Sequence, residues 1–445
     1  MINKAKSRFA WNLLNFNHPD MSTQTMPQNK NLPKKKWGIG RIIGPGLITG
    51  ASDDDPSGIA TYSQAGASFG LSTLWTALFT YPLMAALQEM CARIGLVTSH
   101  GLTGIIKRYY SRPFLWIILL LSFPAIILNI GADLAGMGAV ANLLLPLIPA
   151  PIFSIIIGIT LTYFIVALPY RRIANLLRWL CLSLLCYLVV PFLIKQDWLL
   201  ILRSTFIPKL VMDKAYFAII VGILGTTISP YLFFWQSSME VEEVKMRKLI
   251  VDKRIIQGMQ KDVRGGIFFS NLVFYFIILT TGTVLFNAGV RDIQTVEQAA
   301  LALKPLAGRF SYLLFALGVL GTGLLAVPVL AGSLSYMVSE ALGWKEGLNK
   351  KFHEAKGFYM VMIISILTAL LINLTGISPV RALILTAIIY GITAPFLIGI
   401  ILHICNNKKI MHHNTNGWLS NFLGGLAFLL MTAASIILIY LLLER

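Results

Sequence analysis

Three consecutive aspartates stand inside one of the most apolar parts of this chain. The stretch "ASDDDPSGIATY" places Asp53, Asp54 and Asp55 directly before Pro56, with apolar sequence on both sides. Carboxylate oxygens are hard ligands of the kind that Mg²⁺ and Ca²⁺ prefer. Three neighbouring carboxylates do not all ionise without a large energetic cost unless a cation is present. The cluster therefore indicates a functional site that a cation would stabilise.

The composition places these charges in a membrane. Of the 445 residues, 56% are hydrophobic and only 13% are charged, whereas a soluble protein carries roughly 25% charged residues. The mean hydropathy of +0.73 predicts an integral membrane protein that consists mostly of spanning segments. The formal net charge of +18 is typical of basic cytoplasmic loops. We therefore expect the lipid bilayer, and no nucleic acid, as a partner.

Eleven segments are apolar and long enough to be predicted as spans, which need about 20 residues each. Nine of them are continuous: 72–94, 114–143, 152–170, 173–194, 265–287, 310–338, 357–375, 379–403 and 418–442. Two are interrupted, 42–69 at "DDDPSG" and 215–238 at "GTTISPY". The run before the first interruption covers only about 18 Å of helix. We therefore expect the chain to break inside the membrane, and Pro56 favours an extended conformation at Asp55.

The two interruptions each open a group of five segments. Interrupted helices at corresponding positions of two halves are the best sequence indication of a transporter's central site. This pattern predicts an all-α integral membrane protein with a 5+5 inverted repeat, in which helices 1 and 6 are broken near 54–57 and 227–230. The predicted parts are a disordered basic cytoplasmic tail (1–37), the first repeat (38–214), the second repeat (215–403), and a loop with helix 11 (404–445). Most lysines and arginines fall on one side if the N-terminus is cytoplasmic and the C-terminus is outside.

At this point the chain resembles a known family, the NRAMP (natural resistance-associated macrophage protein) divalent-metal transporters. The resemblance runs from about Gly44 to the last segment. "GPGLITG…DPSG" resembles the break in the family's first helix, "CARIGLVTSHGLTGII" the end of its second helix, and "IGADLAGMGAVANLLL" its third helix. "TTISPY" stands where the family has Met-Pro-His in its sixth helix. The resemblance implies a leucine-transporter-type fold and transport of a divalent cation across a cell membrane, without enzymatic activity or a cofactor.

The resemblance also carries over site residues. Asp55 matches the family's metal-binding aspartate, whereas Gly58 replaces its asparagine and Ser229 replaces its methionine. Loss of the soft thioether leaves hard oxygen ligands and predicts a wider, more acidic pocket that suits a partly hydrated Mg²⁺, with Mn²⁺ as a further substrate. The chain is thus most similar to the NRAMP-related magnesium transporter branch. The predicted metal ligands are Asp55, Ser57, Gly58, Thr226 and Ser229, with Asp54, Asp133 and Tyr231 behind them.

The family's proton route is incomplete in this sequence. Tyr231 replaces its histidine and Gly136 its glutamate, and the ninth segment lacks its arginines. A tyrosine side chain ordinarily titrates near pH 10, and glycine does not titrate at all. We therefore expect alternating-access transport without proton coupling. Nothing in the sequence sets the oligomeric state, and a monomer is compatible with it.

Three alternatives follow from the same residues. The first is a proton-coupled Mn²⁺ or Fe²⁺ carrier that uses Met84 or Met137 as its soft ligand. The second is a Na⁺-coupled amino-acid transporter, which the acid cluster disfavours because such sites receive the substrate carboxylate with few competing anions. The third is an intramembrane aspartyl protease with Asp55 and Asp133 as its dyad, which Pro56 disfavours. Further along the chain, we expect Glu240 on the solvated cytoplasmic surface, with an ion exit as the alternative.

Overall fold

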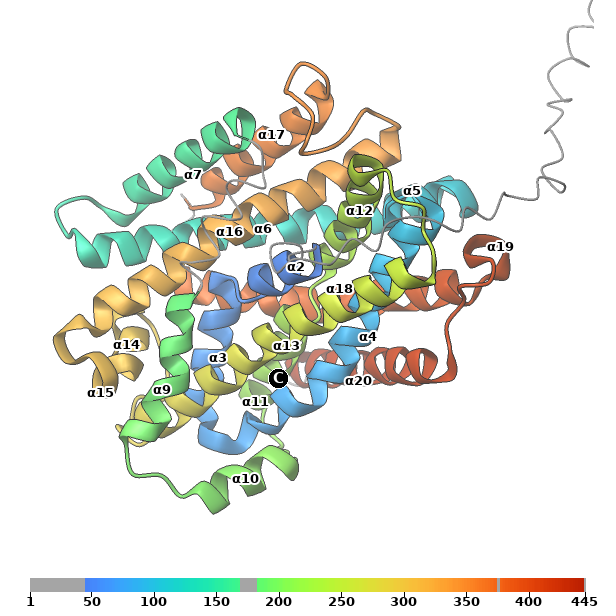
Figure 1. Cartoon of the computed structure of the whole chain (residues 1–445). Helices are drawn as coiled ribbons and strands as arrows, with labels where there is room; N and C mark the ends of the chain where they lie inside the picture. Colours follow the sequence, from blue (N-terminus) through green and yellow to red (C-terminus); the bar gives the residue numbers. More distant parts are fainter. Residues whose placement is uncertain (1–44, 169–181, 374–376, 444–445) are drawn as a thin grey trace, which may run out of the picture. The chain divides into compact units, whose positions relative to one another are not determined.

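The computed structural model describes residues 45–168, 182–373 and 377–443, and every regular element within these ranges is a helix (Figure 1). The expected N-terminal tail (1–37) and much of the fifth predicted span (173–194) lie outside the described residues. The prediction of an all-helical chain is confirmed for the part that the structure describes.

Seven helices in the described part are long and apolar enough to cross a membrane. They are α6 (Arg112–Leu144), α7 (Ala150–Ala167), the broken helix α11–α12 (Lys214–Arg247), α13 (Lys253–Val284), α16 (Ser311–Leu342), α18 (Pro379–Asn406) and α20 (Trp418–Leu443). An eighth is counted if α3 (Pro56–Phe69) and α4 (Trp75–Thr98) are taken together, although the chain bends by 107° between them. The helix α17 (Lys356–Ile372) is apolar but shorter. The chain is therefore a multi-pass membrane protein.

The first predicted break lies between α2 (Pro45–Asp53) and α3, and only Asp54 and Asp55 stand between the two helices. Asp55 has an extended backbone, with φ −68° and ψ 170°, as expected for a residue that precedes proline. Pro56 then occupies the first helical position, where its missing N–H costs nothing. The break is confirmed and is shorter than expected, because Ser57 already belongs to the first turn of α3.

The second break separates α11 (Lys214–Thr227) from α12 (Pro230–Arg247). Only Ile228 and Ser229 are left outside the two helices, and Ser229 is extended before Pro230, with ψ 123°. The two breaks are therefore built alike, because in both an extended residue leads into a proline at the start of the second half-helix.

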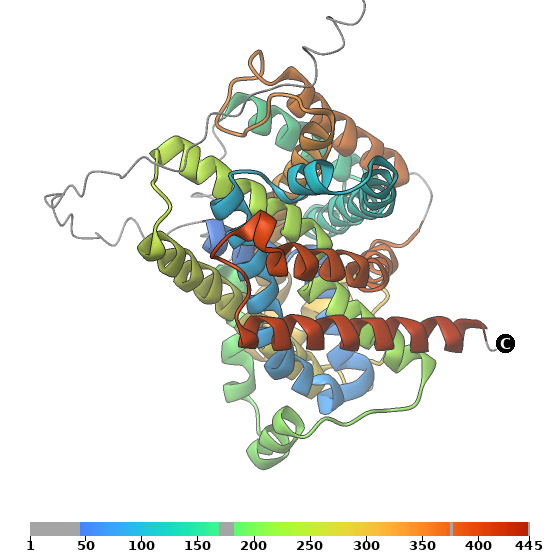
Figure 2. The same ribbon diagram turned by 90° about the vertical axis from the view of Figure 1, so that its right-hand side faces the viewer.

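Glycines allow the half-helices to approach their neighbours closely. α2 and α3 pack against α13, and an added Cβ atom at Gly50 or Gly66 would collide with the α13 backbone. α11 packs against α18 in the same way, because a Cβ atom at Gly225 would overlap the backbone near Gly391. Figure 2 shows α18 with α20 beside it. The first break therefore lies beside α13 and the second beside α18.

The other described α-helices are short. They are α5 (Leu102–Tyr109), α9 (Cys186–Leu193), α10 (Trp198–Phe206), α14 (Val296–Ala300), α15 (Lys304–Ala307) and α19 (Lys408–Met411).

Candidate functional site

Asp55 is fully enclosed and caps the second half of the first broken helix. Its Oδ1 accepts hydrogen bonds from the Ser57 hydroxyl and from the Gly58 backbone N–H, both across 2.7 Å. The carboxylate therefore lies at the N-terminus of α3, where the helix dipole favours a negative charge. The structure thus brings together three of the predicted ligand residues, and all of the bonded atoms are nitrogen or oxygen.

The other oxygen of Asp55 is held from a helix that the sequence did not link to it. Asn129 in α6 donates from Nδ2 to Asp55 Oδ2 across 2.9 Å, and Thr386 in α18 donates to Asn129 Oδ1 across 3.2 Å. Sequence reasoning missed Asn129, although it precedes Asp133 by four residues and so shares its helix face. That spacing was the available signal, because two polar residues one turn apart in an apolar helix indicate a polar wall.

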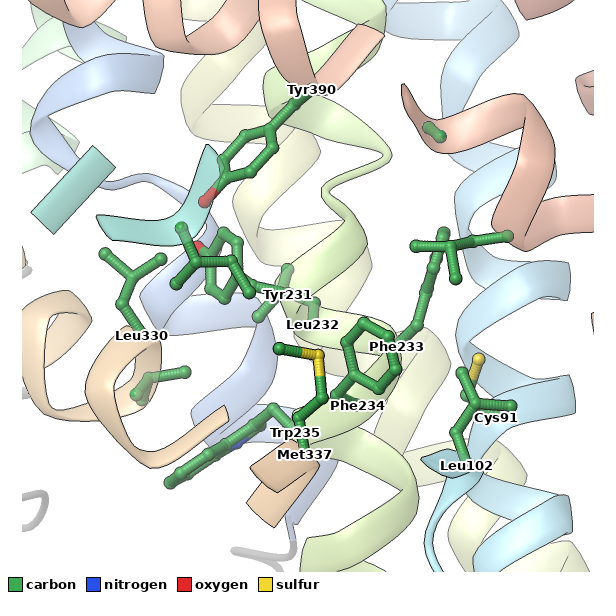
Figure 3. Packing of buried hydrophobic residues seen from close by; sticks show 14 of the residues in the cluster. Cys91, Leu102, Tyr231, Leu232, Phe233, Phe234, Trp235, Leu330, Met337 and Tyr390 are labelled. Carbon is green, nitrogen blue, oxygen red and sulfur yellow. The ribbon is translucent and has the colours of Figure 1, made fainter. Parts of the chain in front are cut away.

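Asp133 and Tyr390 extend this wall. Both oxygens of Asp133 and the hydroxyl of Tyr390 are buried without a hydrogen-bond partner. When ionised, Asp133 and Asp55 repel each other electrostatically. The rings of Tyr390 and Tyr231 lie 5.9 Å apart between their centroids, and Figure 3 shows them close together. Unpartnered buried polar atoms are costly, so this side of the site is poised for a further polar ligand.

Tyr231 connects the two broken helices. Its hydroxyl donates to the backbone carbonyl of Ser52, in the last turn of α2, across 3.0 Å. Tyr231 therefore contacts the half-helix that leads into the first break, and its place behind the ligands stays a prediction.

The structure places Thr226 and Ser229 differently from one another. Ser229 donates its hydroxyl proton to the Thr226 carbonyl across 2.5 Å and approaches the Gly225 carbonyl at 3.2 Å, so its proton is directed to the end of α11. Thr226 faces the first break, because a Cβ atom added to Gly58 would lie 3.2 Å from Thr226 Oγ1 and 3.3 Å from a ring carbon of Tyr62. The expected wider pocket beside Gly58 is therefore wrong, since these two side chains fill the space.

Asp53 and Asp54 turn towards α13. Ser270 donates to Asp53 Oδ2 across 2.7 Å and lies 3.3 Å from Asp54 Oδ1, while Asp53 Oδ1 has no partner. A hydroxyl has one proton, so Ser270 cannot satisfy both carboxylates. Among the described residues, no ion pair involves these acids or Asp55. A cation would therefore stabilise this end of α2.

The expectation for Glu240 is corrected. Glu240 is only 3% exposed, so it does not lie on the solvated surface. Its Oε1 accepts from Gln236 Nε2 across 2.9 Å, and Gln236 in turn accepts from the Thr49 hydroxyl. Glu240 is buried because α2, which contains Thr49, packs over it. Thr49 lies almost 200 residues away in sequence, so the residues around Glu240 do not indicate this burial.

The soft-ligand alternative is tested in part. Met137 is buried, and its sulfur packs on Gly323 in α16, where a ring carbon of Pro56 also makes contact. Met84 is buried in the hydrophobic core of the bundle. In the part of the chain that the structure describes, no three His, Cys, Asp or Glu side chains form a group that could hold a metal ion. A metal at Asp55 would therefore need ligands other than a group of these side chains, such as hydroxyl, amide or carbonyl oxygens, water, or the sulfur of the soft-ligand alternative.

Comparisons with known proteins agree with this architecture. A family model described as natural resistance-associated macrophage protein-like matches residues 46–441. The chain is 24% identical over 390 residues to a divalent metal cation transporter MntH of Chromohalobacter salexigens, which covers 86% of this chain and 87% of that one. A manganese transporter of Eremococcus coleocola has a similar fold, with a TM-score of 0.72 at 18% identity, covering 94% of this chain and 90% of that one. Mhp1, a nucleobase-cation-symport-1 family transporter, gives a TM-score of 0.51 at 15% identity, covering 89% of this chain and 93% of that one.

Proposed function

The chain belongs to the natural resistance-associated macrophage protein-like family, and on that basis we propose that it transports divalent metal cations across a cell membrane. It is a transporter rather than an enzyme, so the dyad of Asp55 and Asp133 has no catalytic role. Relatives with a similar sequence carry the name divalent metal cation transporter, which supports this substrate class.

The proposed mechanism is alternating access in a 5+5 inverted repeat with eleven spans. The matched breaks at Asp55 and Ser229 support it, because each leads into a proline and they lie at corresponding positions of the two proposed repeats (38–214 and 215–403). The orientation follows the distribution of basic residues, with the N-terminus in the cytoplasm and the C-terminus outside.

The proposed ion is Mg²⁺, with Mn²⁺ as a further substrate. The observation that carries this choice is the environment of Asp55, whose bonded neighbours are Ser57, Gly58 and Asn129 and offer only oxygen and nitrogen atoms. Mg²⁺ is usually held through one or two carboxylates and keeps several waters. With the thioether position taken by Ser229, nothing at the second break favours a softer ion.

A second candidate is a proton-coupled Mn²⁺ or Fe²⁺ carrier. It is favoured by Met137, whose sulfur shares the contact at Gly323 with Pro56, the residue that follows Asp55. The manganese transporter with a similar fold points to the same ion.

Uptake into proteoliposomes separates the two candidates. Purified protein is reconstituted, and entry of Mg²⁺, Mn²⁺ and Ca²⁺ is measured at a fixed membrane potential, with and without a pH gradient. We expect Mg²⁺ and Mn²⁺ to enter at rates that do not depend on the pH gradient. Uptake of Mn²⁺ alone, driven by the pH gradient and lost in Met137→Ala, would support the second candidate. No uptake of any divalent ion would overturn the proposed function.

A further inference from the structure

Four polar residues on two helices face Asp55 and form what we name the α6–α18 wall: Asn129, Asp133, Thr386 and Tyr390. Asn129 and Asp133 are four residues apart in α6, and Thr386 and Tyr390 are four residues apart in α18, so each pair shares one helix face. All four side chains are at most 4% exposed.

We propose that Asn129 is the amide ligand of the transported ion and takes the part of the asparagine that Gly58 replaces. The inference rests on the proposed function, since it assigns a residue to the same cation site. Its geometric basis is the contact between Asn129 Nδ2 and Asp55 Oδ2 at 2.9 Å, which places the amide directly on the carboxylate that would hold the ion.

The amide turns its N–H₂ end to Asp55 in this structure, which is the orientation that a carboxylate acceptor favours. A bound divalent ion reverses this preference, because a cation attracts the amide oxygen and repels the amide protons. Rotation about the terminal side-chain bond exchanges the two ends, and such a bond has a broad torsional preference. The same side chain can therefore serve both states without a backbone movement.

Thr386 is suited to both orientations of the amide. Its hydroxyl has a single proton, which lies between the Leu383 carbonyl at 2.7 Å and Asn129 Oδ1 at 3.2 Å. After rotation, Asn129 Nδ2 would donate to the Thr386 oxygen, which keeps its proton on Leu383. A hydroxyl both donates and accepts, so the rotated amide would donate a hydrogen bond to Thr386. Asn129 Oδ1 would then no longer compete with the Leu383 carbonyl for the Thr386 proton.

The unpartnered atoms of the wall are a second observation that favours a cation here. The two buried oxygens of Asp133 and the hydroxyl of Tyr390 make no hydrogen bond of ordinary geometry, although the Ser57 backbone lies near Asp133 and Asn129 lies near Tyr390. Both residues lie within electrostatic range of Asp55, and Tyr390 also lies beside Asn129. An ion with water ligands at Asp55 would offer these atoms the partners that they lack.

The test uses the full chain in detergent with Mn²⁺ as the probe. Isothermal titration calorimetry gives the dissociation constant, and pulsed electron paramagnetic resonance in deuterated water counts the waters on the bound ion. We expect Asn129→Ala to weaken binding roughly tenfold and to add one water to the ion, which replaces the amide oxygen. Thr386→Val should weaken binding less and leave the water count unchanged. Asn142→Ala, in the same helix, is the control, since Asn142 bonds to the Ile148 carbonyl away from the wall.

Each outcome has one interpretation. An unchanged water count in Asn129→Ala, whether or not the affinity falls, would overturn the inference, because Asn129 would then only orient Asp55. Where Asn129→Ala binds too little Mn²⁺ to be counted, Asn129→Ser gives the same readout with a smaller change in volume. A wild-type protein that binds no divalent ion would instead contradict the proposed function itself.

Discussion

The hydroxyl of Tyr231, at the start of α12, donates to the backbone carbonyl of Ser52, in the last turn of α2, across 3.0 Å. This bond joins the two broken helices directly at the depth of the acid cluster. A movement of α2 away from α12 would have to break it, so the bond favours the closed arrangement in which Asp55 is enclosed.

Tyr231→Phe tests this bond. The ring keeps its place beside Tyr390, but the Ser52 carbonyl loses its donor, and we expect a loss of about 1 kcal/mol in stability. Thermal unfolding in detergent measures the change, with Tyr312→Phe as the control because Tyr312 lies exposed near the start of α16. Equal midpoints for the two variants would show that the bond contributes nothing.

Asp55→Asn separates the charge of Asp55 from its role as a helix cap. Asparagine caps helices about as well as aspartate, so α3 should stay intact while divalent uptake is lost. Asp55→Ala should lose uptake and also about 1 kcal/mol of stability from the missing cap. Asp213→Asn is the matched control, because Asp213 caps α11 through the N–H groups of Ala215 and Tyr216, away from the breaks. Uptake at the wild-type rate in Asp55→Asn would remove Asp55 from the site.

Local sequence rules predicted the breaks but not every partner at them. The first break could be predicted because its causes, the short apolar run before Pro56 and the proline itself, lie next to it in the sequence. Asn129 could not, because its contact with Asp55 depends on how α6 is rotated. The direction of the Ser229 hydroxyl proton was also not foreseen, although a hydroxyl at a helix end bonds readily to the carbonyls three and four residues earlier; its role as a ligand stays a prediction. The cover over Glu240 also comes from a distant segment.

Ser229→Met tests the preference for hard ligands. A thioether at this position should raise uptake of Mn²⁺ relative to Mg²⁺ in competition assays. Ser229→Ala is the control, since it removes the bond to the Thr226 carbonyl without adding sulfur. The double variant with Gly58→Asn should add an amide ligand but fold less well, because Thr226 and Tyr62 crowd that position. An unchanged Mn²⁺:Mg²⁺ ratio in folded Ser229→Met would contradict the ligand assignment.

Glu346, between α16 and α17, gives the structure a pH-dependent stability. Burial, together with repulsion from Glu340 and Glu242, raises the pKa of Glu346 from 4.5 to about 8, although Lys245 and Lys350 lower it in part. Between these two values the folded chain holds a proton that the unfolded chain releases, so stability should fall as the pH rises from about 5 to about 8.

Thermal unfolding across this pH range measures the contribution of Glu346. The fall should be weaker in Glu346→Gln, which cannot lose a proton, and unchanged in Glu354→Gln, because Glu354 is half exposed nearby. A pH dependence of equal slope in wild type and Glu346→Gln would assign the effect to other groups.

Transport should not move protons. The prediction rests on the resemblance, which implies that Tyr231 and Gly136 replace the family's histidine and glutamate, and on the bond of Tyr231 to the Ser52 carbonyl rather than to a titrating group. Coupling is also not needed for accumulation. A charge that crosses 100 mV gains about 2.3 kcal/mol, so a divalent ion gains about 4.6 kcal/mol. This energy is enough for a concentration ratio of roughly a thousand or more across the membrane.

Proteoliposomes loaded with a pH-sensitive dye are given an inward Mg²⁺ gradient with the potential clamped. We expect Mg²⁺ entry without acidification of the lumen. Acidification that scales with Mg²⁺ entry and vanishes in Asp55→Asn would establish coupling and refute uniport, while leaving divalent transport itself intact.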